Sequence, residues 1–221
     1  ISGPEGNYDG LMVSYPKLLA ADAVTNQPLF SSVTSHNLEK ATAFLGIKNM
    51  QIFAKVILTR YFLSVIQGIR RFIDADDDWG LFDPTQDPMV IQIAVPTGLL
   101  QKGDQKVEDL MQHSLMVATT LNDQSQEHLD YSYASDIVTA IENTEALPAQ
   151  QSEELQQRCI TYPEVAAGVQ PILQSPNVRD GKFITLDVGA GTVDLNAFHR
   201  WTKSDHKTLD YWACAVEPLG F

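Results

Sequence analysis

Two aspartates and a run of small residues give one stretch of this sequence a clear chemical potential. In Lys182–Arg200, KFITLDVGAGTVDLNAFHR, an apolar strand runs into Asp187 and a second strand leads away from Asp194. Between them lies a tight turn of Gly189, Ala190, Gly191 and Thr192. Its small residues let a ligand approach the backbone, and its N–H groups and the threonine hydroxyl form a concavity that binds anions. Carboxylates at its mouth suit Mg²⁺ held largely through water, so the pattern predicts a Mg–nucleotide site.

The same residues also fit a plain β-hairpin, in which glycine supplies the positive φ of a short turn. Two better-known phosphate motifs do not match. Walker A needs GK[ST] at the start of a helix, and GxGxxG also precedes a helix, whereas a strand follows the turn here. On the pattern of residues alone, both the hairpin and the phosphate site stay open.

The elements before the turn have the order of an α/β layer. Met89–Pro96, MVIQIAVP, is a continuous apolar run rich in β-branched residues, which predicts a buried central strand. Gly103-Asp104 can open a helix after it. The apolar positions of that helix are Val107, Leu110, Met111, Leu115 and Val117. A strand that leads into a helix in this way indicates an α/β fold.

The most hydrophobic segment is Met50–Phe72, which is long enough to raise the question of a membrane span. Lys55 and Arg60 lie inside it, and charges at the centre of a bilayer are costly. Its apolar residues recur at helical spacing: Ile52, Phe53, Val56, Ile57, Leu63, Ile66 and Ile69. We therefore expect a core helix packed on at least two sides.

Shorter elements are predicted around these. Residues 122–158 are polar, with one short helix or strand near residues 137–141, and Pro163–Leu173, PEVAAGVQPIL, is predicted as a short helix. Leu209–Val216 is a third strand. A helix is also expected from about residue 38 to Gly46, which would be its stop.

An acidic loop, DADDDWGLFDPTQDP, follows the hydrophobic helix. Asp74, Asp76 and Asp78 imitate the start of a calcium loop, but the turn glycine comes one place late and position twelve is Thr85. We interpret this loop as a solvated connector.

The overall composition restricts the classes of partner. A net charge of −13 argues against binding to nucleic acid or to an anionic membrane surface. Cys159 and Cys214 form neither a CxxC motif nor a disulfide framework, which favours reduced thiols in a cytoplasmic protein. The first residues, ISGPEGNYDG, do not have the pattern of a signal peptide, and a start at Ile1 suggests a fragment or a processed product.

The stretch FITLDVGAGTVDLNAF resembles the second phosphate motif of the actin and DnaK-type heat-shock ATPase superfamily, Asp-x-Gly-Gly/Ala-Gly-Thr-x-Asp between two strands. VIQIAVPTGLLQKGDQKVEDLM is similar to the strand, Val-Pro and following helix of the heat-shock members. PEVAAGVQPIL resembles their Glu-Pro-x-Ala-Ala helix, which connects two lobes, and LDYWACAVEPLG falls at their third strand of the second lobe. The resemblance covers residues 89–121 and 160–220.

This resemblance implies part of a ribonuclease H-like α/β fold, the actin/heat-shock ATPase fold. Residues 1–160 would be part of lobe one, with a helical subdomain and a polar insertion. Residues 161–221 would be the connecting helix and the first strands of lobe two. ATP and Mg²⁺ are the implied cofactors, and nucleotide is the implied partner. Pro96 would couple the nucleotide state to domain movement, as in the heat-shock members.

The resemblance also assigns roles to the residues of the turn. Gly189, Ala190, Gly191 and Thr192 would contact the β- and γ-phosphates. Asp187 and Asp194 would orient Mg²⁺ and its waters, one of which attacks the γ-phosphate. Tyr162 replaces the family's glutamate before the proline, and Glu164, just after the proline, is the third catalytic candidate.

Two parts of the family's site have no counterpart here: a first phosphate motif near the N-terminus and the glycine pair of the adenosine motif. We therefore expect a fragment of a Mg-dependent ATPase that is inactive alone. A pseudo-ATPase that serves as an interaction module is the first alternative. A relative of the sugar or acetate kinases is the second.

Overall fold

The computed structural model describes residues 19–20, 23–24, 46–75, 89–95, 105–124, 134–188, 192–204 and 206–218. These residues form a mixed α/β structure with two compact units. The larger described parts of the first unit are residues 46–75, 89–90, 109–124 and 134–159; the second holds residues 91–95, 105–108, 160–188, 192–204 and 206–218. The predicted division into residues 1–160 and 161–221 stays a prediction.

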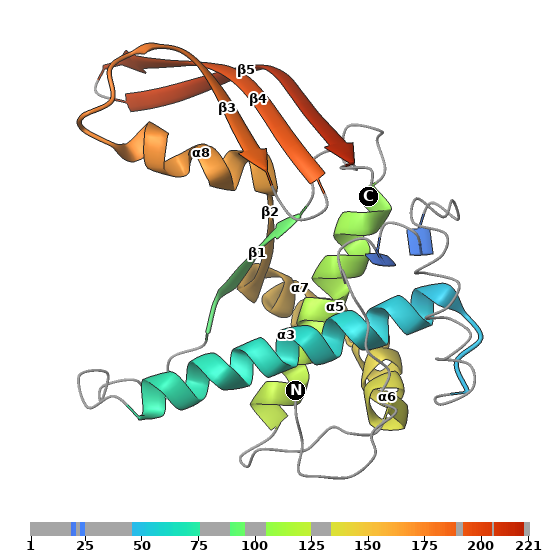
Figure 1. Cartoon of the computed structure of the whole chain (residues 1–221). Coiled ribbons are helices and arrows are strands. Elements are labelled where there is room, and N and C mark those ends of the chain that lie inside the picture. Colours follow the sequence, from blue (N-terminus) through green and yellow to red (C-terminus); the bar gives the residue numbers. More distant parts are fainter. Residues whose placement is uncertain are drawn as a thin grey trace. The chain divides into compact units, whose positions relative to one another are not determined.

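Helix α3, Met50–Asp74, is the long helix of the first unit (Figure 1). The side chain of Asn49 caps it by accepting hydrogen bonds from the backbone N–H groups of Gln51 and Ile52 at 2.8 and 3.3 Å. Its buried residues lie on more than one side, as predicted for a core helix, and include Phe53, Ala54, Val56, Leu58, Thr59, Phe62, Leu63 and Ile66.

Two residues of the predicted buried set of α3 lie at the surface. Ile52 and Ile69 are 38% and 45% exposed. Ile52 belongs to the first turn of the helix, and Ile69 lies near the other end. Helical spacing indicates the direction in which a side chain points, but not how far along the helix its packing partners extend. The prediction was therefore wrong at these two positions.

The polar side chains of α3 are used inside the first unit. Lys55 Nζ lies 2.6 Å from Glu145 Oε1, and Thr59 Oγ1 donates a buried hydrogen bond to the carbonyl of Ser114 at 3.3 Å. By length and composition, residues Met50–Ile73 could cross a membrane, and 44% of their most apolar window is buried in the protein. The buried hydrogen bond of Thr59 packs this helix against the helix that contains Ser114, and the Lys55–Glu145 pair lies nearer the surface, with the Glu145 side chain 52% exposed.

Three further helices belong wholly or mainly to this unit: α5, Gln105–Gln124; α6, Ala134–Glu145; and α7, Ala149–Arg158. The predicted apolar positions of α5 are all buried, and Ile137 and Ile141 bury one side of α6. Helix α7 was not predicted, because Leu155 is its one buried residue and gives no apolar period. Glutamine and glutamate, which favour helices, make up most of its sequence.

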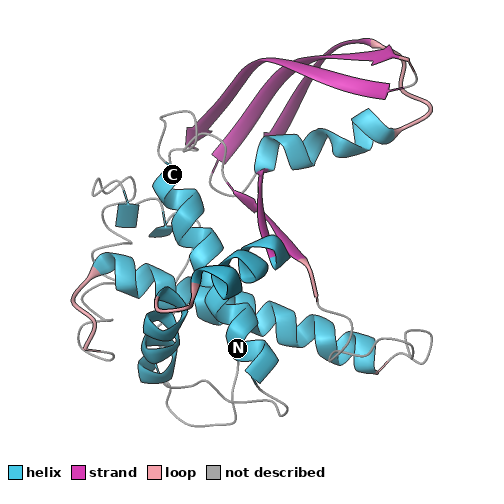
Figure 2. Cartoon of the chain, turned by 180° about the vertical axis from the view of Figure 1, so that it is seen from behind, coloured by secondary structure: helices cyan, strands magenta, loops and turns pink. Residues whose placement is uncertain are grey.

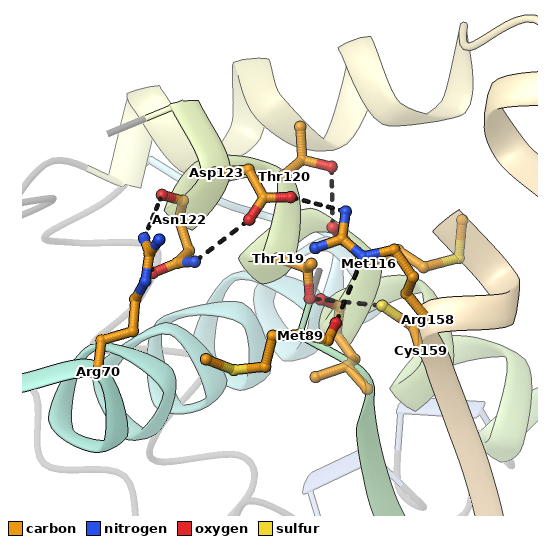
Figure 3. Close-up of polar contacts among 10 residues, drawn as sticks. Arg70, Met89, Met116, Thr119, Thr120, Asn122, Asp123, Arg158 and Cys159 are labelled. Atoms are coloured by element: carbon orange, nitrogen blue, oxygen red, sulfur yellow. Dashed lines mark hydrogen bonds and ion pairs between the residues drawn. The ribbon is translucent and has the colours of Figure 1, made fainter. Parts of the chain in front are cut away.

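Two arginines bind the C-terminal end of α5 (Figure 3). Arg70 of α3 donates to the backbone carbonyl and the side-chain oxygen of Asn122, both at 3.3 Å. Arg158 of α7 pairs with Asp123 at 2.8 Å and donates to the carbonyl of Met89 at 3.3 Å. Both arginines are cations at the negative end of the α5 helix dipole, which is a favourable position for positive charge. Their contacts link α3 and α7 to α5.

Cys159 lies beside this arginine network and is fully buried. Its sulfur is 3.4 Å from Thr119 Oγ1 (Figure 3). Burial raises the pKa of its thiol, which keeps it in the protonated, unreactive form.

Strand β1, Ile91–Val95, pairs with β2, Cys159–Pro163, in a two-stranded sheet. The prediction of a buried central strand was wrong for the described residues. Val95 is its one buried residue, and Val90 just before it is 60% exposed. A continuous apolar run indicates apolar packing partners, and α8 contacts β1. The run does not indicate how many strands pair with it.

The second unit contains the two predicted strands on either side of residues 189–191. Strands β3, Gly181–Val188, β4, Thr192–Lys203, and β5, His206–Pro218, form an antiparallel sheet in this order. Helix α8, Glu164–Gln174, lies along one face of the sheet (Figures 1 and 2). Both the predicted helix and the predicted third strand are confirmed.

The two faces of this sheet differ. The face toward α8 carries buried Asn196, Phe198 and Arg200, and Phe198 stacks on Phe183 with ring centroids 5.5 Å apart. The opposite face exposes several apolar side chains, Ile184, Leu186, Val188, Leu195 and Trp212, and Lys182 Nζ lies 5.2 Å from the Trp212 ring.

Candidate functional site

Asp187 and Asp194 are direct partners in the β3–β4 ladder. The pair Val188 and Val193 is the last of this ladder before residues 189–191. Residues that face each other in an antiparallel ladder project from the same face, with Cβ atoms about 4.5–5.5 Å apart. The alternation of the strands therefore brings the two predicted carboxylates together at the end of the sheet nearest the turn.

A cavity of about 220 Å³ lies between these strands and α8. It is lined by residues of three elements: Glu164 and Gly168 of α8, Thr185, Leu186 and Asp187 of β3, and Asp194 and Asn196 of β4. Glu164 and Gly168 are one helical turn apart, so both face the sheet from the first half of α8. All three carboxylates proposed from the sequence as catalytic thus line one cavity.

The lining of the cavity is acidic. Its charged residues are Glu164, Asp187 and Asp194, and its remaining polar side chains are those of Thr185 and Asn196. A phosphate group without a counter-ion would be repelled by three carboxylates. Within the described residues, no group of three or more histidine, cysteine, aspartate or glutamate side chains lies close enough to hold a metal ion directly. This donor set fits a cation that keeps its water shell, as Mg²⁺ often does.

Asn196 was missed by the sequence analysis. It is 5% exposed, and its Nδ2 donates to Thr185 Oγ1 at 3.3 Å. Its Oδ1 is buried and has no hydrogen-bond partner among the residues that the structure describes. The signal that could have found it is the strand period of two, because Asn196 lies two residues after Asp194 and shares its face.

A second missed residue, Arg200, holds the C-terminal end of α8. Its buried guanidinium lies 2.6 Å from Asp180 Oδ1 and donates to the carbonyls of Leu173 at 3.4 Å and Ser175 at 3.5 Å. Lys207 of β5 donates to the carbonyl of Gln174 at 2.9 Å. Strands β4 and β5 thereby hold α8, the helix whose Glu164 and Gly168 line the cavity.

Tyr162 occupies the position at which the resemblance expects a glutamate. Its hydroxyl accepts a hydrogen bond from Gln170 Nε2 of α8 at 3.0 Å. The hydroxyl therefore joins the end of β2 to the middle of α8, whereas Glu164 is the acidic residue of this segment that lines the cavity.

Several residues named from the sequence lie outside the described residues. These are Gly189, Ala190 and Gly191 of the turn, Pro96, and the acidic loop after residue 75. Thr192 is described by its backbone alone, as the first residue of β4 and the partner of Pro218 in β5. The predicted helix before Gly46 also lies outside, and Gly46 itself has a φ of 66°.

No family model, no curated protein and no solved structure matches this chain.

Proposed function

We propose that this chain belongs to a Mg-dependent ATP-binding protein with the fold of the actin and DnaK-type ATPases. One observation carries the proposal: Glu164, Asp187 and Asp194, taken from two separate motifs of the sequence, line the same cavity. The cavity lies at the end of the sheet where β3 ends and β4 begins, on either side of the residues that resemble a phosphate motif. We place the protein in the cytoplasm, a proposal supported by the buried free thiol of Cys159.

The finer fold is part of this proposal. Its support is the succession of elements around the turn: a helix of small residues, then a strand, the turn, a second strand and a third antiparallel strand. In the superfamily that the sequence resembles, the same helix connects two lobes and the same strands open the second lobe.

The roles of the residues follow from their chemistry. Bound Mg²⁺ would neutralise phosphate charge and supply ordered water. The carboxylates of Asp187 and Asp194 accept hydrogen bonds from water, and so orient it at the end of the sheet. The carboxylate of Glu164 faces the same cavity from α8 and can accept the proton of an attacking water. The N–H groups of the turn would hold the phosphate oxygens, so catalysis would come from positioning and electrostatics.

The test is a titration of the chain with ATP, followed by calorimetry, in the presence of Mg²⁺ and in the presence of EDTA. We expect binding that is weaker than micromolar and requires Mg²⁺, because the acidic cavity repels bare phosphate. Asp187→Asn should abolish it. Asp109→Asn, a matched loss of charge on the exposed side of α5, should leave it unchanged. Binding of ATP that is equally strong in EDTA would contradict the proposal.

The pseudo-ATPase alternative has its own supporting observation. Tyr162 stands where the family has a glutamate, and its hydroxyl is engaged by Gln170. Phosphate release by a longer protein that includes the missing motifs separates the two functions. Turnover that Asp187→Asn removes supports an ATPase, and Mg–ATP binding without turnover supports an interaction module.

A further inference from the structure

We propose that Asn196 is an additional binding residue of this cavity, and that its Oδ1 accepts a hydrogen bond from a water molecule of a hydrated divalent cation. The inference rests on the proposed function, since it concerns the same cavity. It adds a neutral acceptor to the acidic groups that the phosphate motif supplies.

The side-chain oxygen of Asn196 lacks a hydrogen-bond donor among the described residues. Asn196 is only 5% exposed, and this Oδ1 atom is buried. A buried acceptor without a donor destabilises the folded state, so groups of this kind usually meet water or a ligand. The other end of the amide is fixed, because Nδ2 donates to Thr185 Oγ1 at 3.3 Å.

The Asn196–Thr185 pair lies on the same face of the ladder as the pair of aspartates. Asn196 and Thr185 are direct partners, and Asp194 and Asp187 are partners two residues nearer the turn. All four side chains share the face toward α8, and all four residues line the cavity. The sheet therefore presents two layers of polar groups to the cavity, a carboxylate layer at the turn and an amide–hydroxyl layer behind it.

A donor to Asn196 Oδ1 must suit the acidic lining of the cavity. Three carboxylates line the cavity, and none of the other residues that line it carries a positive charge. A donor that enters it must be compatible with this negative potential. Water bound to a divalent cation is such a donor, because the cation polarises its O–H bonds and is itself attracted by the carboxylates.

The space beside Asn196 is also consistent with a ligand. Gly168 lines the cavity from the interior of α8, where glycine is unfavourable for a helix. A Cβ added at Gly168 would meet no atom within 4 Å, so close packing does not explain the glycine. The opening at this position leaves room for a hydrated ion or for a group that the ion carries.

The experiment measures binding of Mn²⁺ to the whole chain by electron paramagnetic resonance, with competition by Mg²⁺. Asn196→Leu keeps the approximate size and removes the acceptor, and should weaken Mn²⁺ binding about tenfold, the effect of one such hydrogen bond. Asn196→Asp retains an oxygen acceptor and adds charge, and should tighten binding several-fold. Asn177→Leu, in the exposed turn after α8, is the control for loss of an amide and should bind as the wild type does.

The outcomes separate the two proposals. If the wild type binds Mn²⁺ and Mg–ATP, and both Asn196 variants bind with unchanged affinity, the role of Asn196 is overturned and the proposed function stands. If Mn²⁺ binding depends on Asn196 but ATP does not bind with Mg²⁺, the nucleotide function fails and the cation site stands. Absence of Mn²⁺ binding by the wild type overturns the inference. Asn196→Asp decides the matter if Asn196→Leu does not fold, which circular dichroism will show.

Discussion

Arg200 of β4 and Asp180, which precedes β3, form an ion pair at 2.6 Å that lies at the C-terminal end of α8. The arginine side chain is 4% exposed and the aspartate side chain is 45% exposed. Asp180 also accepts hydrogen bonds from the backbone N–H and the hydroxyl of Thr202 at 2.8 and 3.0 Å. One carboxylate thus holds the guanidinium that fixes the helix of the candidate site.

Replacement of Arg200 should destabilise the second unit. Arg200→Met keeps the length of the side chain but leaves the carbonyls of Leu173 and Ser175 without this donor. We expect the free energy of unfolding to fall by about 1–3 kcal/mol, the usual cost of unpaired buried groups. Urea denaturation followed by circular dichroism measures it. Lys203→Met, an exposed loss of the same charge on the same strand, should change it little. An equal effect of both substitutions would contradict a special role for Arg200.

Two glycines inside helices provide a matched pair for the cavity. Gly168 of α8 lines it, and Gly68 of α3 does not; an added Cβ would meet no atom within 4 Å at either position. Gly168→Ala and Gly68→Ala should each stabilise the chain by about 0.5–1 kcal/mol, measured as a rise in the unfolding midpoint.

Binding then distinguishes the two positions. Gly168→Leu places a side chain toward the cavity and should weaken Mg–ATP binding, whereas Gly68→Leu should leave it unchanged. Equal binding by the wild type and by the Gly168→Leu variant, both folded, would show that the ligand does not use this space.

His113 gives the first unit a predictable dependence on pH. Burial, and then the nearby charge of Lys55, lower the pKa of His113 below its ordinary value of 6.5; Glu145 partly opposes this. Both ring nitrogens of His113 are buried, and neither has a hydrogen-bond partner among the described side chains and backbone groups. The unfolded chain therefore binds a proton more readily than the folded chain.

The sign follows from this difference. The contribution of neutral His113 to stability is fully present above about pH 6.5 and is lost as the pH falls below it toward the lower folded pKa. His113→Gln should flatten the fall in unfolding free energy as the pH drops below about 6.5, measured by urea denaturation. A slope unchanged by His113→Gln would contradict the assignment.

Cys159 should resist alkylation in the folded chain. Its side chain is fully buried and burial raises its pKa, so the thiolate that reacts is both inaccessible and scarce. In a Cys214→Ser background Cys159 is the one thiol of the chain. Iodoacetamide should modify it slowly in buffer and rapidly in urea, as measured by mass spectrometry. Rapid modification without urea would show that the segment around Thr119 opens readily.

The sequence identified the elements whose signals are local. The two strands that carry Asp187 and Asp194 were predictable as apolar runs on either side of small residues, and α8 from its alanine-rich pattern. The five apolar positions predicted for α5 followed from their spacing, and all five are buried. Strand alternation then accounts for the shared face of the two aspartates, because it needs the ladder register alone.

What was missed depends on partners far along the chain. The roles of Arg200 and Asn196 come from Asp180, Thr185 and the end of α8, which lie 11 to 27 residues away. Helix α7 has too few apolar residues to show a period, and the edge position of β1 depends on which strands pair with it. The strand period places Asn196 on the face of Asp194, but its hydrogen bond to Thr185 and the contacts of Arg200 depend on long-range pairing that a local pattern does not show.

The open face of the three-stranded sheet has a consequence for the behaviour of the chain in solution. Ile184, Leu186 and Val188 are 75%, 61% and 64% exposed, and they form an apolar row along β3. A row of this kind promotes contact between molecules, whereas the net charge of −13 keeps them apart. Added salt shortens the range of this repulsion and strengthens the apolar attraction. Colloidal stability of the chain is therefore expected to decline as ionic strength rises, which light scattering across a salt series would record.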